Sequence, residues 1–173
     1  IFKLFNFDLI DVLPQTTHGG SMRYVVARNN SRKIKKNVQK YLEYEKKNNI
    51  DSKKGCLKFK KKCELSRKKL KNKINNIIKN KKNIAGYAAT SKSTTILNYC
   101  NIDHRHIDFI SDTTAEKIGK FAPGTHIPIV SMKHFRKKIP DYTFLFAWNH
   151  KNEIFKKEKK FLKKTKWIAH IKI

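Results

Sequence analysis

The chain has 173 residues and a formal net charge of +28, from 41 lysine and arginine side chains against 13 aspartate and glutamate side chains. A chain of this length with 39% hydrophobic residues can build a core, so wholesale disorder is excluded and one domain is the default. No run of eighteen apolar residues occurs, and we expect neither a membrane span nor a secretory signal. Ile1 already lies inside an apolar pattern, which suggests a fragment of a longer polypeptide.

The cysteines give no sign of a disulfide framework or a metal site. Cys56, Cys63 and Cys100 cannot all pair with one another, and their spacing differs from the C-x2-C of a zinc site. We therefore expect reduced, buried thiols, no bound metal and a cytoplasmic location.

The positive charge has two interpretations. A field of this size attracts nucleic acids and other polyanions. However, only six of the 41 basic residues are arginines, the residue type that reads phosphates and base edges with paired hydrogen bonds. Lys, Asn and Ile share A/T-rich codons, so a genome of low G+C content would produce the same bias. We expect no specific nucleic-acid partner, although non-specific, salt-dependent attraction follows from the field.

Composition divides the chain into three segments, residues 1–31, 32–82 and 83–173. In the first, an apolar run from Phe7 stops at Pro14, and a second β-rich run follows a Gly-Gly turn, which predicts two strands. In the second, apolar residues at helical spacing predict two Lys-rich amphipathic helices separated at Asn48–Ser52. These helices either pack on the body of the protein or present a coiled-coil surface.

The third segment alternates strands with helices. We expect strands at 83–88, 107–110, 127–130, 142–148 and 167–171, a helix after residue 95 and a Lys-rich helix at 151–164. This order predicts an α/β fold, a Rossmann-like, mostly parallel sheet with flanking helices, preceded by the short hairpin and the two helices. Ligands of such sheets bind at the carboxyl ends of the strands, so the loops after residues 88, 111 and 148 are the expected site.

The turn at 89–95 is the first candidate for binding chemistry. It combines hydroxyl residues, Lys92 and the start of a helix, which suits a phosphate. The G-x-G-x-x-G and G-K-[ST] patterns are absent, and only Gly86 precedes the turn. A simple capping turn is the alternative interpretation.

Several histidines lie beside turn residues. The turn from His18 contains two glycines and is followed by Arg23, so it is either a structural hairpin turn or an anion site. His126 and His150 each stand alone in a loop, where a structural role is common. We expect His104 and His106 to be solvated. No Ser-His-Asp set, H-E-x-x-H or close carboxylate pair indicates a catalytic centre.

The order of four motifs is more specific than any one of them. They are Thr17-His18-Gly19-Gly20-Ser21-Met22-Arg23, Gly86-Tyr87-Ala88-Ala89-Thr90-Ser91-Lys92 with Leu97-Asn98-Tyr99-Cys100, Pro123-Gly124-Thr125-His126-Ile127-Pro128, and Ala147-Trp148-Asn149. In this order they resemble the C-terminal domain of S-adenosylmethionine-dependent sugar C-methyltransferases, over nearly the whole chain.

The resemblance implies a fold and a function. Enzymes of this family have an N-terminal zinc-binding segment, a central methyltransferase domain and a C-terminal Rossmann-like domain, and they methylate a carbon beside the keto group of a nucleotide-linked deoxysugar. The base and the S-adenosylmethionine site would then lie in an upstream domain of the same polypeptide, so these residues alone would be inactive. Three residues depart from the family pattern, where glycine is usual: Ala88, Ser93 and Asn101.

We therefore expect a domain that binds the nucleotide-linked sugar. Arg23 and Lys92 are assigned to its phosphates, and the other candidates to hydrogen bonds with sugar or base. The complete set is His18, Gly19, Gly20, Ser21, Arg23, Gly86, Tyr87, Lys92, Asn98, His126, Trp148 and Asn149. The alternative is a basic nucleic-acid-binding or scaffold module built on the Lys-rich helices, which leaves the Gly, His and Trp-Asn turns unexplained.

Overall fold

A computed structural model describes residues 1–171, and these fall into two compact units that divide between Lys62 and Cys63. Each unit is described by itself. None of the helices in this part of the chain has both the length and the apolar character that a membrane span requires.

The first unit begins with the expected hairpin. Strands β1 (Phe7–Gln15) and β2 (Ser21–Arg28) pair antiparallel. His18, Gly19 and Gly20 all have positive φ in the connecting turn, as the two glycines predicted. Pro14 does not end the strand as expected. It pairs opposite Met22 within β1, because a strand in a two-stranded sheet has an outer edge where no N–H is needed.

Two helices follow the hairpin, α1 (Lys36–Lys47) and α2 (Lys53–Lys79), with the expected break between them. Asp11 of β1 is buried and fixes the start of α1, accepting hydrogen bonds from Lys35 Nζ at 2.8 Å and Asn37 Nδ2 at 3.3 Å. The division between the units falls inside α2.

Only the last part of α2 buries the apolar side chains of its amphipathic pattern. Its buried residues are Leu70, Ile74 and Ile77, whereas Phe59 is 69% exposed. The expectation of three buried thiols is likewise wrong for Cys56, which is exposed on this helix, and Cys63 is only half-buried. Helical spacing gives the side of a helix on which apolar residues lie, but another element must cover that side before they are buried.

The second unit contains the predicted sheet. Five parallel strands lie in the order β5-β4-β3-β6-β7. From β3 the chain winds outward to β5 and then returns to the centre at β6, so the winding reverses between β3 and β6. The strands are β3 (Ile84–Tyr87), β4 (Ile110–Asp112), β5 (Ile129–Ser131), β6 (Tyr142–Leu145) and β7 (Lys166–Ile168).

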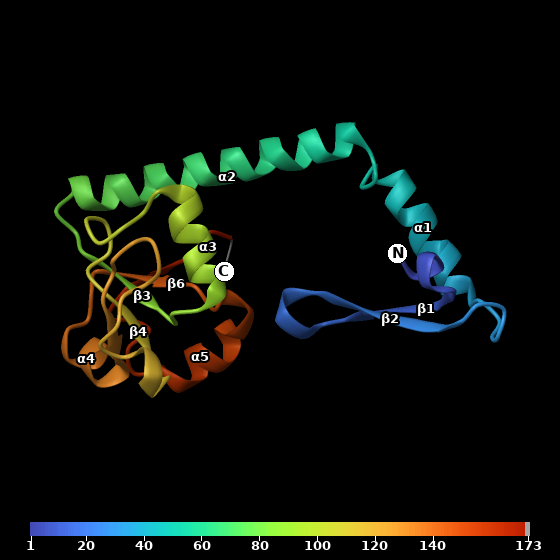
Figure 1. Cartoon of the computed structure of the whole chain (residues 1–173). Coiled ribbons are helices and arrows are strands. Elements are labelled where there is room, and N and C mark those ends of the chain that lie inside the picture. Colours follow the sequence, from blue (N-terminus) through green and yellow to red (C-terminus); the bar gives the residue numbers. More distant parts are fainter. Residues whose placement is uncertain (172–173) are drawn as a thin grey trace. The chain divides into compact units, whose positions relative to one another are not determined.

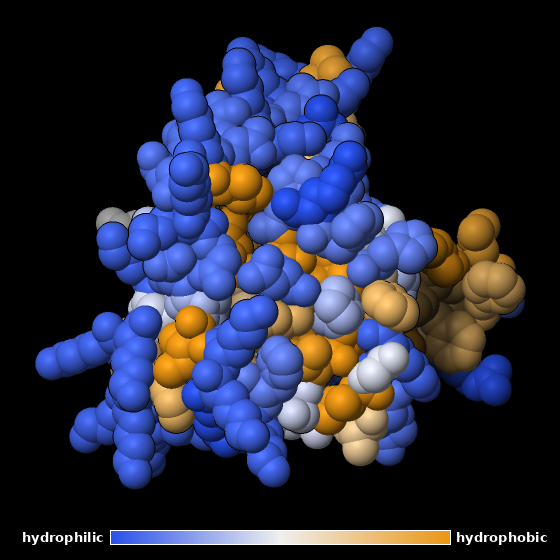
Figure 2. All heavy atoms as spheres, turned by 90° about the vertical axis from the view of Figure 1, so that its left-hand side faces the viewer, coloured by the Kyte–Doolittle hydropathy of each residue, from blue (hydrophilic) through white to orange (hydrophobic). Residues whose placement is uncertain are grey.

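Helices cover both faces of this sheet (Figure 1). One face packs against the end of α2 and against α3 (Ser91–Cys100), with Ile74 and Leu97 in its core. The other packs against α4 (Met132–Lys137) and α5 (Lys151–Lys157), with Phe135 fully buried. This double cover explains why β3 is buried along its whole length. In the view of Figure 2, hydrophilic side chains cover most of the molecular surface, and hydrophobic side chains are visible between them.

The outer limits of several elements differ from the prediction. β4 and β5 begin two or three residues later than expected, because Ile107 and Ile127 are buried in the loops that lead into them. The helix expected over 151–164 ends at Lys157, and the following residue, Glu158, is turned into the core.

Candidate functional site

The site is built where the winding of the sheet reverses. The strands are parallel, so the carboxyl ends of β3 and β6 meet at one edge of the sheet, which we call the carboxyl edge. A hollow of about 310 Å³ opens there. Residues that follow β3, β4 and β6 line it, among them Ala88, Thr113 and His150.

The turn after β3 directs a helix N-terminus to this edge. Ala88 has a φ of 73°, a left-handed conformation that favours glycine, and its N–H donates to the Ser111 carbonyl at 2.8 Å. Thr90 then caps α3, its side-chain oxygen accepting from the Ser93 N–H at 3.2 Å. The first N–H groups of α3 and the positive end of its dipole therefore lie at the carboxyl edge.

Three predicted site residues meet beside this helix. Lys92 Nζ donates to Asn149 Oδ1 at 2.8 Å and lies 5.4 Å from the centre of the Trp148 ring. Lys92 follows β3 and the other two follow β6, so the contact bridges the point where the winding reverses. The structure thus brings Lys92, Trp148 and Asn149 together as one cationic group with an amide and an indole.

His170, after β7, adds a group that the sequence analysis did not select. Its ring centre lies 6.2 Å from that of Trp148. Burial lowers the pKa of the imidazole, and the positive charge of Lys92 lowers it further. Its Nδ1 is buried and has no hydrogen-bond partner among the described residues. A ligand with a polar atom could satisfy it.

Asp112 and Lys117 hold the turn after β3 from two sides, and sequence reasoning missed both. Asp112 Oδ2 accepts from the Ala89 N–H at 2.7 Å and Oδ1 from the Thr114 N–H at 2.8 Å, while Lys117 Nζ donates to the Ala89 carbonyl at 2.8 Å. Burial would raise the pKa of Asp112, but the hydrogen bonds from Thr114 and Ala89 and the charge of Lys117 hold it below its ordinary value. An acid at the end of the strand beside β3 was the available signal.

The same contacts bear on whether a nucleoside cofactor fits this edge. In Rossmann sites a glycine-rich turn approaches the phosphates and an acid after the next strand binds the ribose. Here the turn is Ala88-Ala89-Thr90, and both oxygens of Asp112 bind backbone N–H groups. These residues do not fit S-adenosylmethionine bound in that manner. In the described chain no three His, Cys, Asp or Glu side chains are grouped to hold a metal such as zinc.

Gly86 and Tyr87, two further candidates, have structural roles beneath the site. A Cβ at position 86 would come within 2.7 Å of the Phe146 ring, so glycine is needed there for packing. The buried Tyr87 hydroxyl donates to Glu158 at 3.0 Å, and Arg136 donates to the same carboxylate at 2.6 Å. Burial raises the pKa of Tyr87, and the Glu158 charge raises it further. No motif in the sequence distinguishes Arg136 and Glu158 from their Lys-rich surroundings.

Asn98 and His126 lie elsewhere in the second unit. Asn98 is near the end of α3 and donates to the carbonyls of Thr94 and Pro123, at 2.8 and 3.0 Å. His126 is exposed in the loop that precedes β5. Since α3 runs back along the sheet from β3, both residues are at the amino ends of the strands, away from Lys92.

The remaining candidates belong to the first unit. All are exposed and lie on the hairpin turn or at the start of β2, where they neighbour one another. They are His18, Gly19, Gly20, Ser21 and Arg23. Their role in anion binding stays a prediction.

Comparison with known proteins extends this picture. Residues 16–171 match the family described as the C-methyltransferase C-terminal domain. The chain is also 32% identical over 163 residues to C-methyltransferase NovU of Streptomyces niveus. That alignment covers 94% of the chain and 39% of the relative, so the chain spans about two fifths of the length of this curated protein.

Proposed function

The chain belongs to the family of C-methyltransferase C-terminal domains, and we propose that its carboxyl edge binds the phosphates of a nucleotide-linked keto-deoxysugar that the whole enzyme methylates. The observation that carries this proposal is the Lys92–Asn149 contact, at 2.8 Å, beside the N-terminus of α3. It lies at the carboxyl edge of the sheet, the place where ligands of such folds bind.

The groups at this edge suit a diphosphate that carries polar rings. Lys92 supplies a positive charge, and the first N–H groups of α3 are donors aligned with the helix dipole. Asn149 and His170 can exchange hydrogen bonds with the sugar or the nucleobase, and the Trp148 ring offers a flat apolar surface. His18, Ser21 and Arg23 remain proposed substrate contacts of the complete enzyme, whereas Asn98 and His126 lie at the opposite edge of the sheet and are not assigned to this substrate.

We propose that the methyl-transfer chemistry resides in an upstream domain. Since Asp112 is engaged with backbone N–H groups, the carboxyl edge is a poor site for S-adenosylmethionine. The cofactor, the base that forms the enolate, and any zinc would then be held outside residues 1–173. The chain by itself is expected to bind substrate without turning it over.

Calorimetric titration of the chain with thymidine diphosphate tests the phosphate site. One charge-assisted contact is worth about 1.5–3 kcal/mol, so Lys92→Ala should raise the dissociation constant about ten- to a hundredfold. Lys133→Ala on α4 removes the same charge from an exposed position and should leave binding unchanged. Equal affinity of Lys92→Ala and the unmodified chain would mean that the turn is only a helix cap.

The basic-module alternative rests on the exposed Lys-rich part of α2, where Phe59 is also exposed. It predicts tight, sequence-tolerant binding to DNA with a steep dependence on salt. Reversing the charge of Lys61, Lys68 and Lys71 should abolish such binding. If the proposal is right, these changes leave thymidine diphosphate binding intact.

A further inference from the structure

A second hollow, of about 520 Å³, opens at the opposite edge of the sheet. It is lined by the end of α3, by α2, and by the loops that lead into β4 and β5. Parallel strands bring their amino ends to one edge, so this amino-edge hollow lies away from Lys92. Its polar lining includes Lys71, Asn98, Asp103, Arg105 and His106.

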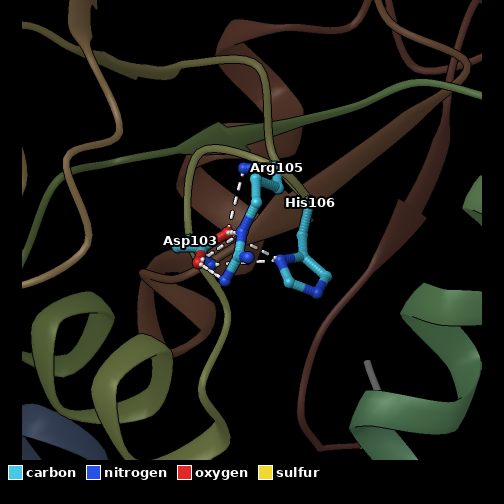
Figure 3. Close-up of polar contacts among 3 residues, drawn as sticks. All are labelled: Asp103, Arg105 and His106. Carbon is cyan, nitrogen blue, oxygen red and sulfur yellow. Dashed lines mark hydrogen bonds and ion pairs between the residues drawn. The ribbon is translucent and has the colours of Figure 1, made fainter.

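Arg105 pairs with Asp103 within this lining (Figure 3). Its Nη2 donates to Asp103 Oδ2 at 2.6 Å, and its Nε donates to the same oxygen at 3.0 Å. His106 Nδ1 lies 2.9 Å from the other carboxylate oxygen. The hydrogen bonds from Arg105 hold the pKa of Asp103 well below its usual range, so Asp103 is ionised at neutral pH and forms an ion pair with Arg105.

The ion pair with Asp103 leaves much of the Arg105 guanidinium available. Asp103 takes two of its five N–H groups, Nε–H and one on Nη2, which leaves three on a side chain that is 75% exposed. A guanidinium that already makes these hydrogen bonds loses less rotational freedom when it binds an oxyanion.

The charges around the hollow favour an anion. Lys71 and Arg105 outweigh the single carboxylate of Asp103 among the side chains that line it. The C-terminus of α3 opposes them with about half a negative charge. That effect is reduced because Ile102 N–H caps the Leu97 carbonyl at 2.9 Å and Asn101 N–H caps the Asn98 carbonyl at 3.2 Å.

Asn98 contributes an acceptor at a fixed position. Its amide nitrogen donates to two backbone carbonyls, and its Oδ1 faces Gly124 so closely that any side chain at position 124 would collide with it. Gly124 has a φ of 74°, so both its conformation and its lack of a Cβ suit this contact. A hydroxyl group is the natural donor to Oδ1.

We propose that the amino-edge hollow binds a phosphate monoester of a hydroxylated small molecule. Arg105 and Lys71 bind the phosphate, and Asn98 accepts a hydrogen bond from a hydroxyl. The site depends on residues of the second unit alone, and it stands or falls independently of the function proposed for the carboxyl edge.

Ribose 5-phosphate is the probe for this site. Titrated into the ¹⁵N-labelled chain, it should shift the backbone amides of residues 103–106 and the side-chain amide of Asn98. Arg105→Lys keeps the charge but loses the planar fork, and Lys71→Ala loses the second cation. Each should weaken the binding that these signals report about tenfold or more. Ribose without phosphate should not shift them.

Two control variants separate a built site from the general field. Lys68 lies on the same helix as Lys71, is exposed and does not line the hollow. Lys68→Ala should therefore leave the affinity for ribose 5-phosphate unchanged. Lys92→Ala should weaken thymidine diphosphate binding without moving the ribose 5-phosphate response at residues 103–106. Equal losses in Lys68→Ala and Lys71→Ala, or no response at residues 103–106, would overturn the proposal.

Discussion

Each edge of the sheet has a cationic side chain and a side-chain amide, yet these groups are supported in different ways. At the carboxyl edge, Lys92 lies in the first turn of α3, directly after a turn that Asp112 and Lys117 hold and that buried Tyr87 precedes. At the amino edge, the exposed Arg105 side chain pairs with Asp103, two residues away in the same loop. The first site therefore depends on the fold as a whole, whereas the second depends on a contact between two neighbouring residues.

The largest expected effect comes from the buried carboxylate beneath the carboxyl edge. Glu158→Ala leaves the Tyr87 hydroxyl without its acceptor and Arg136 without its partner, and Glu158 is fully buried. Breaking a buried pair costs about 3–5 kcal/mol, and partial exposure of Arg136 reduces this to about 2–4 kcal/mol. Urea unfolding measures the loss. Asp103→Ala, which breaks the pair with the 75% exposed Arg105, should cost clearly less, and equal losses would contradict the comparison.

A smaller loss of stability is expected when the hydrogen bonds between Asp112 and the turn after β3 are removed. Asp112→Ala removes the acceptors of the Ala89 and Thr114 N–H groups, which should cost about 2 kcal/mol of unfolding free energy. Because the turn then loses its position, thymidine diphosphate should also bind more weakly. Binding of ribose 5-phosphate should stay the same. A variant that loses stability but keeps full affinity for the diphosphate would show that Asp112 does not position this turn.

Protonation of Asp112 in acid should weaken the same hydrogen bonds gradually. The pKa of Asp112 is lowered in the folded state, so its stabilisation is complete above the ordinary value of about 3.9 and is lost as pH falls through the folded pKa. A ¹³C-carboxyl titration should place the midpoint of Asp112 below about 3.9. In Asp112→Asn the pH dependence of unfolding below that value should be shallower than in the unmodified chain. A midpoint at or above it would mean that burial outweighs the hydrogen bonds.

The smallest effect concerns the backbone of the turn. Ala88 has a φ of 73°, where a Cβ is strained, so Ala88→Gly should stabilise the chain by about 0.5–1 kcal/mol. Asn101 also has a positive φ, of 50°, but asparagine tolerates it as a helix C-cap. Asn101→Gly should therefore change stability by only a few tenths of a kcal/mol. A destabilising Ala88→Gly would contradict this account of the turn.

The sequence predicted the order of strands and helices because buried parallel strands are short apolar runs between turns. It could not predict their limits, since Ile107 and Ile127 are as buried as strand residues. Lys92, Trp148 and Asn149 were selected because each follows a strand, and the structure brings these three side chains together. Asp112, Glu158 and Arg136 were missed because their importance comes from partners distant in the sequence. Helical periodicity likewise could not show that the apolar side chains of α2 are buried only from Leu70 onward.

The departures from the family pattern also have a local explanation. Ala88 and Asn101 both occupy left-handed positions, where glycine is the least strained residue. Ser93 lies buried in the first turn of α3, and its hydroxyl donates to the Thr90 carbonyl at 2.5 Å. The turn and helix of this chain thus accommodate all three residues.

An ¹⁵N chemical-shift titration with thymidine diphosphate shows whether a nucleotide phosphate binds at the carboxyl edge. We expect the backbone amides of residues 89–93, the side-chain amide of Asn149 and the Trp148 indole N–H to shift together and to saturate. In Lys92→Ala these shifts should need about ten- to a hundredfold more ligand. Shifts confined to the lysine-rich residues 53–69 of α2, fading as salt is raised, would contradict the account and favour a general polyanion surface.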